Sequence, residues 1–336
     1  MKKALLATSM LVATAAMGHA EGIRIANFGG SYGDAMAAAI WDPIAEARGI
    51  EIGKDTFAGI ADVRAQVRAN SIGWDIGELT IDECAIGSRE GLFQNLNLTS
   101  EETEGYPENA VHEDYILVNT ASYVPVWQGN VMPLTSWADF WDVENFPGPR
   151  ALRDDPMENL VAALIADGVP LEEVYPLDVD RAFRKLEEIK PEITTWWSSG
   201  AQGAQLLSSG EVDYAGGWTT RVGALINEGV EVGYTLNGGI MIPDCLFIPS
   251  GAKSAELARD VLKDALSVEL QKSLPEYIDA SPINQDVYAE GILAPEILEK
   301  QVATPENMKL QVLTDGVWWA EHGNAVKERW QEFKAQ

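Results

Sequence analysis

The sequence predicts an α/β protein, because segments typical of strands alternate with segments typical of helices along the chain. A strand-like segment at residues 22–28 runs through a glycine turn toward a helix-like segment, as an α/β unit does. The chain has 336 residues, 46% of them apolar, which is enough for two domains or one large domain with an ample core. It contains no low-complexity linker and no internal repeat.

The elements after the opening strand follow from local turn and capping signals. The turn covers residues 29–33, and Asp34 is expected to cap a helix through residue 44, in which Pro43 would be a kink or an early stop. Helices are then predicted over residues 61–69 and 82–89, the second closed by Gly91, with a strand at 74–79 between them.

The same reading continues to the C-terminal part of the chain. A strand at 147–153 precedes a helix at 156–166 that Gly168 ends, and Ser198 or Ser199 caps a helix at 201–207. Strands follow at 212–216 and at 240–249, which is the most apolar strand. Apolar residues spaced three and four apart between 258 and 266 then predict a helix that lies on a sheet.

The N-terminus has the pattern of a cleavable secretory signal. Lys2 and Lys3 precede an apolar stretch at residues 4–17, and cleavage is expected after Ala20, so residues 1–20 are a signal peptide. The apolar stretch is too short to cross a bilayer, and no cysteine follows the cleavage site to carry a lipid anchor. The mature protein is therefore expected outside the cytoplasm, in the periplasm.

The formal net charge is −28, and it becomes −30 without Lys2 and Lys3. Such a charge repels phosphate backbones and anionic lipids, so it argues against nucleic acid or a membrane surface as a partner. A cationic ligand and a merely solvated acidic surface both remain consistent with it.

Cys84 and Cys245 are an even pair in an exported protein, so a disulfide is one expectation and two buried free thiols are the other. With His112 and His322 as the mature chain's histidines, no zinc-type ligand cluster is predicted. The common nucleophile, phosphate-loop and metalloprotease motifs are absent. The many carboxylates leave an exported acid/base hydrolase open.

Trp218 ends a predicted strand, where open α/β sheets bind ligands, and aromatic faces beside carboxylates suit an organic ammonium.

Five segments carry a resemblance to a known family: NFGGSYGDAM from Asn27, TSWADFWDVENFPGPRAL from Thr135, WWSSGAQGAQLLSSGEVDYAGGW from Trp196, DCLFIPSGAKSAELA from Asp244 and WWAEHGNAVKERWQEF from Trp318. In this order and spacing, the chain resembles the periplasmic solute-binding proteins of ABC importers, in their spermidine/putrescine-binding branch. The resemblance covers about residues 23–333.

This resemblance implies a type II periplasmic binding protein fold, with two α/β lobes and a ligand cleft between them. Residues 21–120 and 240–300 would form the first lobe, and residues 121–239 and 301–336 the second. It also implies a non-enzymatic monomer without a cofactor or metal. The protein would close its lobes around a small amine ligand and deliver it to an ABC permease in the inner membrane.

The resemblance also assigns ligand-binding roles by position. The aromatic and hydroxyl residues of the cleft would be Phe28, Ser31, Tyr32, Thr80 and Trp218, and the acids would be Asp82, Asp155, Glu158 and Asp244. Both cysteines would then lie on the first lobe near the cleft, which favours their disulfide.

Two positions depart from the polyamine-binding pattern. Ile242 replaces a tryptophan, and Asp82 replaces another aromatic residue, so a shorter or more polar cationic or zwitterionic solute is expected instead of spermidine. An alternative keeps the fold but binds an anion, a sugar phosphate or a metal chelate. That alternative needs arginines or paired tyrosines in the cleft, and the nearby basic candidates are Arg24, Arg153 and Arg221.

Overall fold

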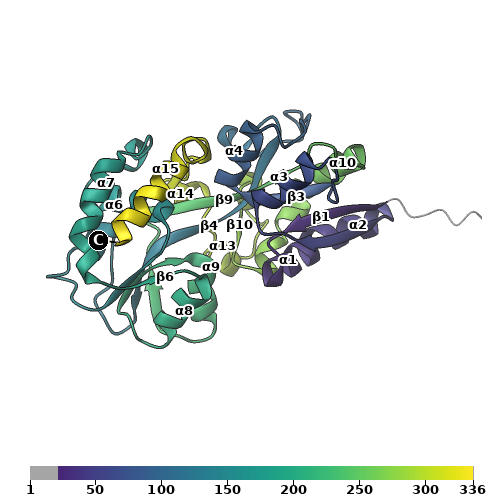
Figure 1. The fold of residues 1–336 in the computed structure, drawn as a ribbon. Coiled ribbons are helices and arrows are strands. Elements are labelled where there is room, and N and C mark those ends of the chain that lie inside the picture. Colours follow the sequence, from purple (N-terminus) through teal and green to yellow (C-terminus); the bar gives the residue numbers. More distant parts are fainter. Residues whose placement is uncertain (1–21, 336) are drawn as a thin grey trace, which may run out of the picture.

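The computed structural model describes residues 22–335, and the expected signal segment lies outside them. Two α/β lobes lie side by side and share long central strands, which confirms the predicted fold class (Figure 1). The strands follow one hydrogen-bonded path in the order β2-β1-β3-β9-β4-β7-β5-β6, with β8 and β10 also paired to β4 and β11 to β9. No helix in residues 22–335 is both long and apolar enough to span a bilayer.

The first lobe lies at the right of Figure 1 and is built on the β2-β1-β3 end of the sheet. Its elements are β1 (Gly22–Asn27), α1 (Gly30–Met36), α2 (Asp42–Arg48), β2 (Glu51–Thr56), α3 (Ile60–Arg68), β3 (Ile76–Thr80), α4 (Ile81–Arg89), α10 (Ala255–Ala265), α11 (Val268–Gln271), α12 (Leu274–Tyr277) and β10 (Ser281–Pro282). The short helix α13 (Pro295–Leu298) follows β10 in the chain.

The predicted start of the first helix is wrong. Asp34 lies inside α1, which begins at Gly30 because Gly29 adopts a positive φ of 67° that turns the chain sharply out of β1. Pro43 does not stop the helix, because it occupies the first turn of α2, where a missing backbone N–H costs little. A π-helical turn, Ala37–Trp41, joins the two helices.

The second lobe contains the parallel strands β5 (Arg150–Arg153), β6 (Ile193–Trp197) and β7 (Tyr214–Trp218). Around them lie α5 (Trp137–Trp141), α6 (Pro156–Ala166), α7 (Val179–Ile189), α8 (Gly200–Ser208), α9 (Thr219–Asn227) and the short strand β8 (Val232–Tyr234). The predicted helix at 156–166 is confirmed, because Asp155 caps it by accepting the N–H of Met157 at 3.0 Å and Pro156 fits its first turn. Of the two serines predicted to cap α8, Ser199 is the cap, because its side chain accepts the N–H of Gln202.

Two long strands pass through both lobes. β4 (Tyr115–Gln128) and β9 (Gly239–Phe247) pair with each other in antiparallel fashion. One part of β9 pairs with β3 of the first lobe, and the other part pairs with β11 (Gln311–Leu313). The predicted lobe boundaries near residues 120 and 240 fall within these continuous strands, and they stay a prediction.

The C-terminal helix α15 (Gly316–Ala335) touches both lobes, as Figure 1 shows in yellow. At its start, Gly316 packs so closely on α4 that a Cβ would lie 2.6 Å from the Ile81 carbonyl oxygen. Near its end, the Trp330 indole N–H donates to Asp154 at 2.9 Å in the second lobe. The short helix α14 (Pro305–Met308) precedes β11.

Cys84 of α4 and Cys245 of β9 form a disulfide, with Cα atoms 6.6 Å apart. The resemblance-based expectation is confirmed, and the alternative of two free thiols is wrong. The bridge joins residues 161 positions apart.

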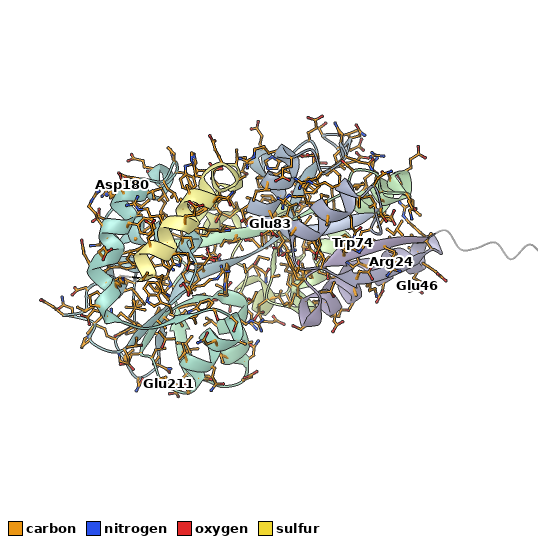
Figure 2. All side chains as sticks on the ribbon, viewed as in Figure 1. Arg24, Glu46, Trp74, Glu83, Asp180 and Glu211 are labelled. Atoms are coloured by element: carbon orange, nitrogen blue, oxygen red, sulfur yellow. A yellow bond between two sulfur atoms is a disulfide. The ribbon has the colours of Figure 1, made fainter. Side chains whose placement is uncertain are left out.

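Acidic side chains cover the outside of both lobes. Figure 2 shows Glu46 on the first lobe and Asp180 and Glu211 on the second, and all three are exposed. Most of the negative charge is therefore solvated.

Candidate ligand-binding site

A cavity of about 800 Å³ opens between the lobes. The first lobe and the crossing strands supply Phe28, Ser31, Tyr32, Thr80, Asn119, Ile242 and Asp244, and the second lobe supplies Trp218, Thr220, Arg221 and Asn227. Lys300 and the segment from Pro275 to Ala280 also line the cavity. The volume lies in the range typical of sites for small organic ligands.

Six of the nine predicted site residues line this cavity: Phe28, Ser31, Tyr32, Thr80, Trp218 and Asp244. They come together because the strands β1, β3 and β7 each end at the cavity, as open α/β sheets arrange their ligand sites. Their roles in binding stay a prediction. The other three, Asp82, Asp155 and Glu158, do not line it.

Asp82 is 8% exposed and lies in the first turn of α4. The Thr80 hydroxyl donates to its carboxylate at 2.7 Å. A negative charge is favourable at this end of a helix, so Asp82 stabilises the junction between β3 and α4.

Asp155 and Glu158 are occupied by Arg153. Glu158 has no exposed surface and forms a close ion pair with the Arg153 guanidinium, which also lies 3.8 Å from Asp155. The guanidinium stacks 5.5 Å from the centre of the Trp218 ring. Arg153 therefore supplies the positive charge that an ammonium ligand was predicted to bring to these two acids.

The acidic side of the cavity is made by Asp244 and, behind it, Glu78. Asp244 of β9 pairs in register with Thr80 of β3 and with Asn119 of β4. Its half-buried side chain lines the cavity. Glu78 has no exposed surface and accepts hydrogen bonds from the Tyr32 hydroxyl and, at 3.4 Å, from the Asn119 amide.

The pKa values of both carboxyl groups are raised above their usual range. Burial raises the pKa of Glu78 to about 7, although hydrogen bonds from Tyr32 and Asn119 oppose the shift. Burial and then the charge of Glu78 raise the pKa of Asp244 well above its usual range. Burial also raises the pKa of Tyr32, which therefore keeps its hydroxyl proton. Such perturbed groups facing a cleft are typical of functional sites.

The opposite wall carries a ring and a positive charge. Trp218 ends β7 and lies edge-on to the buried Tyr123, with ring centres 5.7 Å apart. Arg221 lies in the first turn of α9 on the same wall, and its side chain packs against the start of α8, where a Cβ on Gly200 would be 3.2 Å from its Nε atom. Lys300, which also lines the cavity, donates to Asn227 at 3.2 Å.

Sequence reasoning missed Glu78 and Asn119 and did not assign Arg221 to an amine site. A glutamate in the interior of an otherwise apolar strand, IGELT, was a usable signal for Glu78, since buried acids need a reason. Asn119 carried no signal because its strand was not predicted. Within residues 22–335, no group of three or more His, Cys, Asp or Glu residues is arranged to hold a metal ion.

Comparisons with known proteins agree with this architecture. The family model described as bacterial extracellular solute-binding protein matches residues 40–307. The γ-aminobutyric acid (GABA)-binding protein of Pseudomonas aeruginosa is 30% identical over 340 residues, covering 96% of this chain and 94% of that protein. The spermidine/putrescine-binding periplasmic protein of Escherichia coli is 27% identical over 234 residues, covering 68% and 65%.

Two solved structures support the same relationship. An ABC transporter substrate-binding protein from Bradyrhizobium japonicum is 38% identical with a TM-score of 0.88, covering 93% of this chain and 99% of that one. A GABA receptor is 29% identical with a TM-score of 0.84, covering 94% and 98%. The protein therefore belongs to the bacterial extracellular solute-binding family, as the substrate-binding component of an ABC transporter.

Proposed function

We propose that this protein captures a small zwitterion with an amino group and a carboxylate, with GABA as the first candidate. The observation that carries the proposal is the charge distribution of one cavity, where Asp244, with Glu78 behind it, lies on one side and Arg221 on the other. This cavity is also lined by Glu276, Asp279 and Lys300. A ligand with both charges is complementary to both sides.

The amino group would lie against Asp244, with the faces of Phe28 and Trp218 beside it. A charge-assisted hydrogen bond to a carboxylate and the attraction of a cation to ring faces both favour an ammonium group here. Phe28 is 38% exposed and lies edge-on to Tyr32, with ring centres 5.6 Å apart, so it is available to a ligand.

The carboxylate would lie against Arg221 and the first turn of α9. A guanidinium can bind both oxygens of a carboxylate. The first backbone N–H groups of a helix have no partner within the helix and favour a negative charge, and the cavity-lining Thr220 belongs to that turn.

A polyamine is less complementary to this site, because Asp155 and Glu158 are already paired with Arg153. The likeness to the GABA-binding protein also extends over 96% of the chain, against 68% for the polyamine-binding relative. In place of the polyamine-like ligand expected from the sequence, the proposed ligand therefore carries a single ammonium group. The anion-binding alternative accounts for Arg221 and gives no role to the acidic pair of Asp244 and Glu78.

In the proposed cycle, the lobes close about the crossing strands, since the ligand contacts both sides and so favours the closed arrangement. An inner-membrane ABC permease would then receive the ligand. Export through the signal at residues 1–20, cleavage after Ala20, a periplasmic location and a monomeric state all belong to this proposal.

Isothermal titration calorimetry on ligand-free protein tests the proposal. GABA should bind one-to-one without turnover, whereas butylamine and butyrate, each of which retains one charge, should bind at least roughly tenfold more weakly. Putrescine should also bind more weakly than GABA. Equal affinity for butyrate and GABA, with none for amines, would establish the anion reading instead, and product formation would indicate a hydrolase.

Two charge-removing variants locate the ligand. Asp244→Asn and Arg221→Gln should each weaken GABA binding at least roughly tenfold, because each loses a charge-assisted contact. Asp260→Asn and Arg68→Gln make the same chemical changes at exposed positions outside the cavity, and they should leave the affinity unchanged.

A further inference from the structure

Glu78 is a carboxyl group with no access to solvent or to the cavity, placed directly behind the side chains that line it. Four elements face it: β1 through Asn27, α1 through Tyr32, β4 through Asn119 and β9 through Asp244. None of these is a cation. One oxygen of Glu78, Oε2, is buried without a hydrogen-bond partner.

The hydrogen bonds within this cluster indicate which of its acids holds a proton. The Asn119 amide donates to the Tyr32 oxygen at 2.8 Å and to Glu78 Oε1 at 3.4 Å, and the single Tyr32 hydroxyl proton also goes to Oε1. Glu78 Oε1 thus accepts two hydrogen bonds, which favour the ionised form of Glu78. The single Tyr32 hydroxyl proton is given to Glu78 and so does not stabilise an ionised Asp244, which favours the protonated form of Asp244.

Electrostatic repulsion also favours one protonated and one ionised acid in the free protein. Two neighbouring carboxyl groups in a poorly solvated site do not both ionise easily without a cation. An ammonium group in the cavity would supply that cation and would stabilise the ionised form of both.

We propose that Glu78 is a concealed second carboxylate of the amine subsite, and that an ammonium group entering the cavity releases one proton from Asp244 to solvent. The ammonium keeps its own three protons, and Asp244 gives its carboxyl proton to water or buffer. The cluster carries one negative charge before binding, and with the ligand's ammonium it carries one negative charge afterwards. Glu78 is a positioning residue that touches no ligand atom. The inference rests on the proposed function only in requiring a ligand with an ammonium group.

The consequence is a defined dependence of affinity on pH. At a pH where Asp244 is protonated in the free protein, each lower pH unit weakens binding by up to tenfold, because a proton competes with the ligand. At a pH where both acids are ionised without ligand, the dependence disappears. The ammonium and carboxylate of GABA do not titrate between about pH 6 and 8, so the ligand adds no slope of its own.

Calorimetry with GABA at about pH 6.5 in MES, phosphate and imidazole buffers of equal ionic strength measures the proton directly. Each proton released by the protein is taken up by the buffer, so the slope of the observed enthalpy against the ionisation enthalpy of the buffer, with its sign reversed, is the number of protons released. We expect a value near one for the wild-type protein. Glu78→Gln keeps the shape of the side chain, and it should lower the count by half or more and flatten the dependence of log Kd on pH.

Glu83→Gln is the matched control. Glu83, labelled in Figure 2, is another largely enclosed glutamate whose pKa is raised by burial. It does not line the cavity. The variant should leave the proton count unchanged. Binding without proton release in the wild type, an unchanged count in Glu78→Gln, or an equal drop in Glu83→Gln would each overturn the inference. If Glu78→Gln does not fold, the number of protons that the wild-type protein releases on binding GABA still tests the inference. Failure to bind any ammonium compound would instead overturn the proposed function.

Discussion

Replacing Arg153 by methionine tests whether Asp155 and Glu158 serve the structure or the ligand. The substitution keeps an unbranched side chain of related length and leaves Glu158, which has no exposed surface, without its ion-pair partner. Breaking one side of a buried pair costs about 3–5 kcal/mol while the remaining group is charged. Once Glu158 takes up a proton, the loss falls to that of a hydrogen bond, about 1 kcal/mol.

The sign of the pH dependence follows from that difference. Burial raises the pKa of Glu158 and the Arg153 charge opposes the shift, so removing Arg153 raises this pKa further. A raised carboxyl pKa in the folded state destabilises the protein increasingly as the pH rises from the unfolded-state value through the folded-state value. We therefore expect Arg153→Met to lose about 3–5 kcal/mol of unfolding free energy at pH 8 and about 1–2 kcal/mol at pH 5.

Guanidinium unfolding followed by fluorescence gives these values. The double variant Arg153→Met/Glu158→Gln should recover about 2 kcal/mol or more of the loss at pH 8, as coupled neighbours do. Glu158→Gln alone should leave GABA affinity within about twofold, because Glu158 does not line the cavity. Equal destabilisation by Arg153→Met at both pH values, or a tenfold loss of affinity in Glu158→Gln, would refute the reasoning.

Three further predictions concern the disulfide, the aromatic wall and a close contact beneath it. Reducing Cys84–Cys245 should lower the unfolding free energy by up to about 5 kcal/mol, because the bridge closes a loop with a separation of 161 residues; a double serine variant should show the same stability with and without reductant. Trp218→Leu should weaken GABA binding roughly 5- to 30-fold through loss of the ring face, measured by calorimetry, with an unchanged affinity counting against that role. Gly216→Ala should cost about 1–3 kcal/mol in a denaturant titration, because its Cβ would lie 2.0 Å from the Tyr123 hydroxyl of a fully buried ring; a wild-type midpoint would contradict this.

The elements that the sequence predicted well carry their own local signals. The helix α6 has the Asp155 cap, a proline in its first turn and a glycine just beyond its end, and its predicted bounds are those observed. The strand β1 and the helix α10 likewise follow from period-two and period-3.6 apolar patterns.

The strand β4 lacked such a signal. Its sequence, YILVNTASYVPVWQ, does not alternate, and Pro125 argues against a central strand because it cannot donate a ladder hydrogen bond. The structure nevertheless pairs Pro125 with Gly216 of β7. The strand's path through both lobes depends on long-range pairing with β9, which no local pattern contains.

The site was predicted in part for the same reason. A predicted strand end identified the position of Trp218, and the family resemblance identified that of Asp244. The pairing of Glu158 with Arg153, in contrast, depends on the conformation of a long side chain. The role of a charge thus depends on its spatial neighbours, and a sequence motif reports the residue type alone.

Asn119 and Asp244 lie on β4 and β9, the strands that join the two lobes. Detection of the ligand and movement of the lobes would therefore occur in the same few residues, with no relay between a distant sensor and a joint. A change in the angle between the lobes would alter the geometry of the amine-binding groups directly. Selectivity and mobility would then have to evolve together in this protein, since a substitution in these strands that tunes one also alters the other.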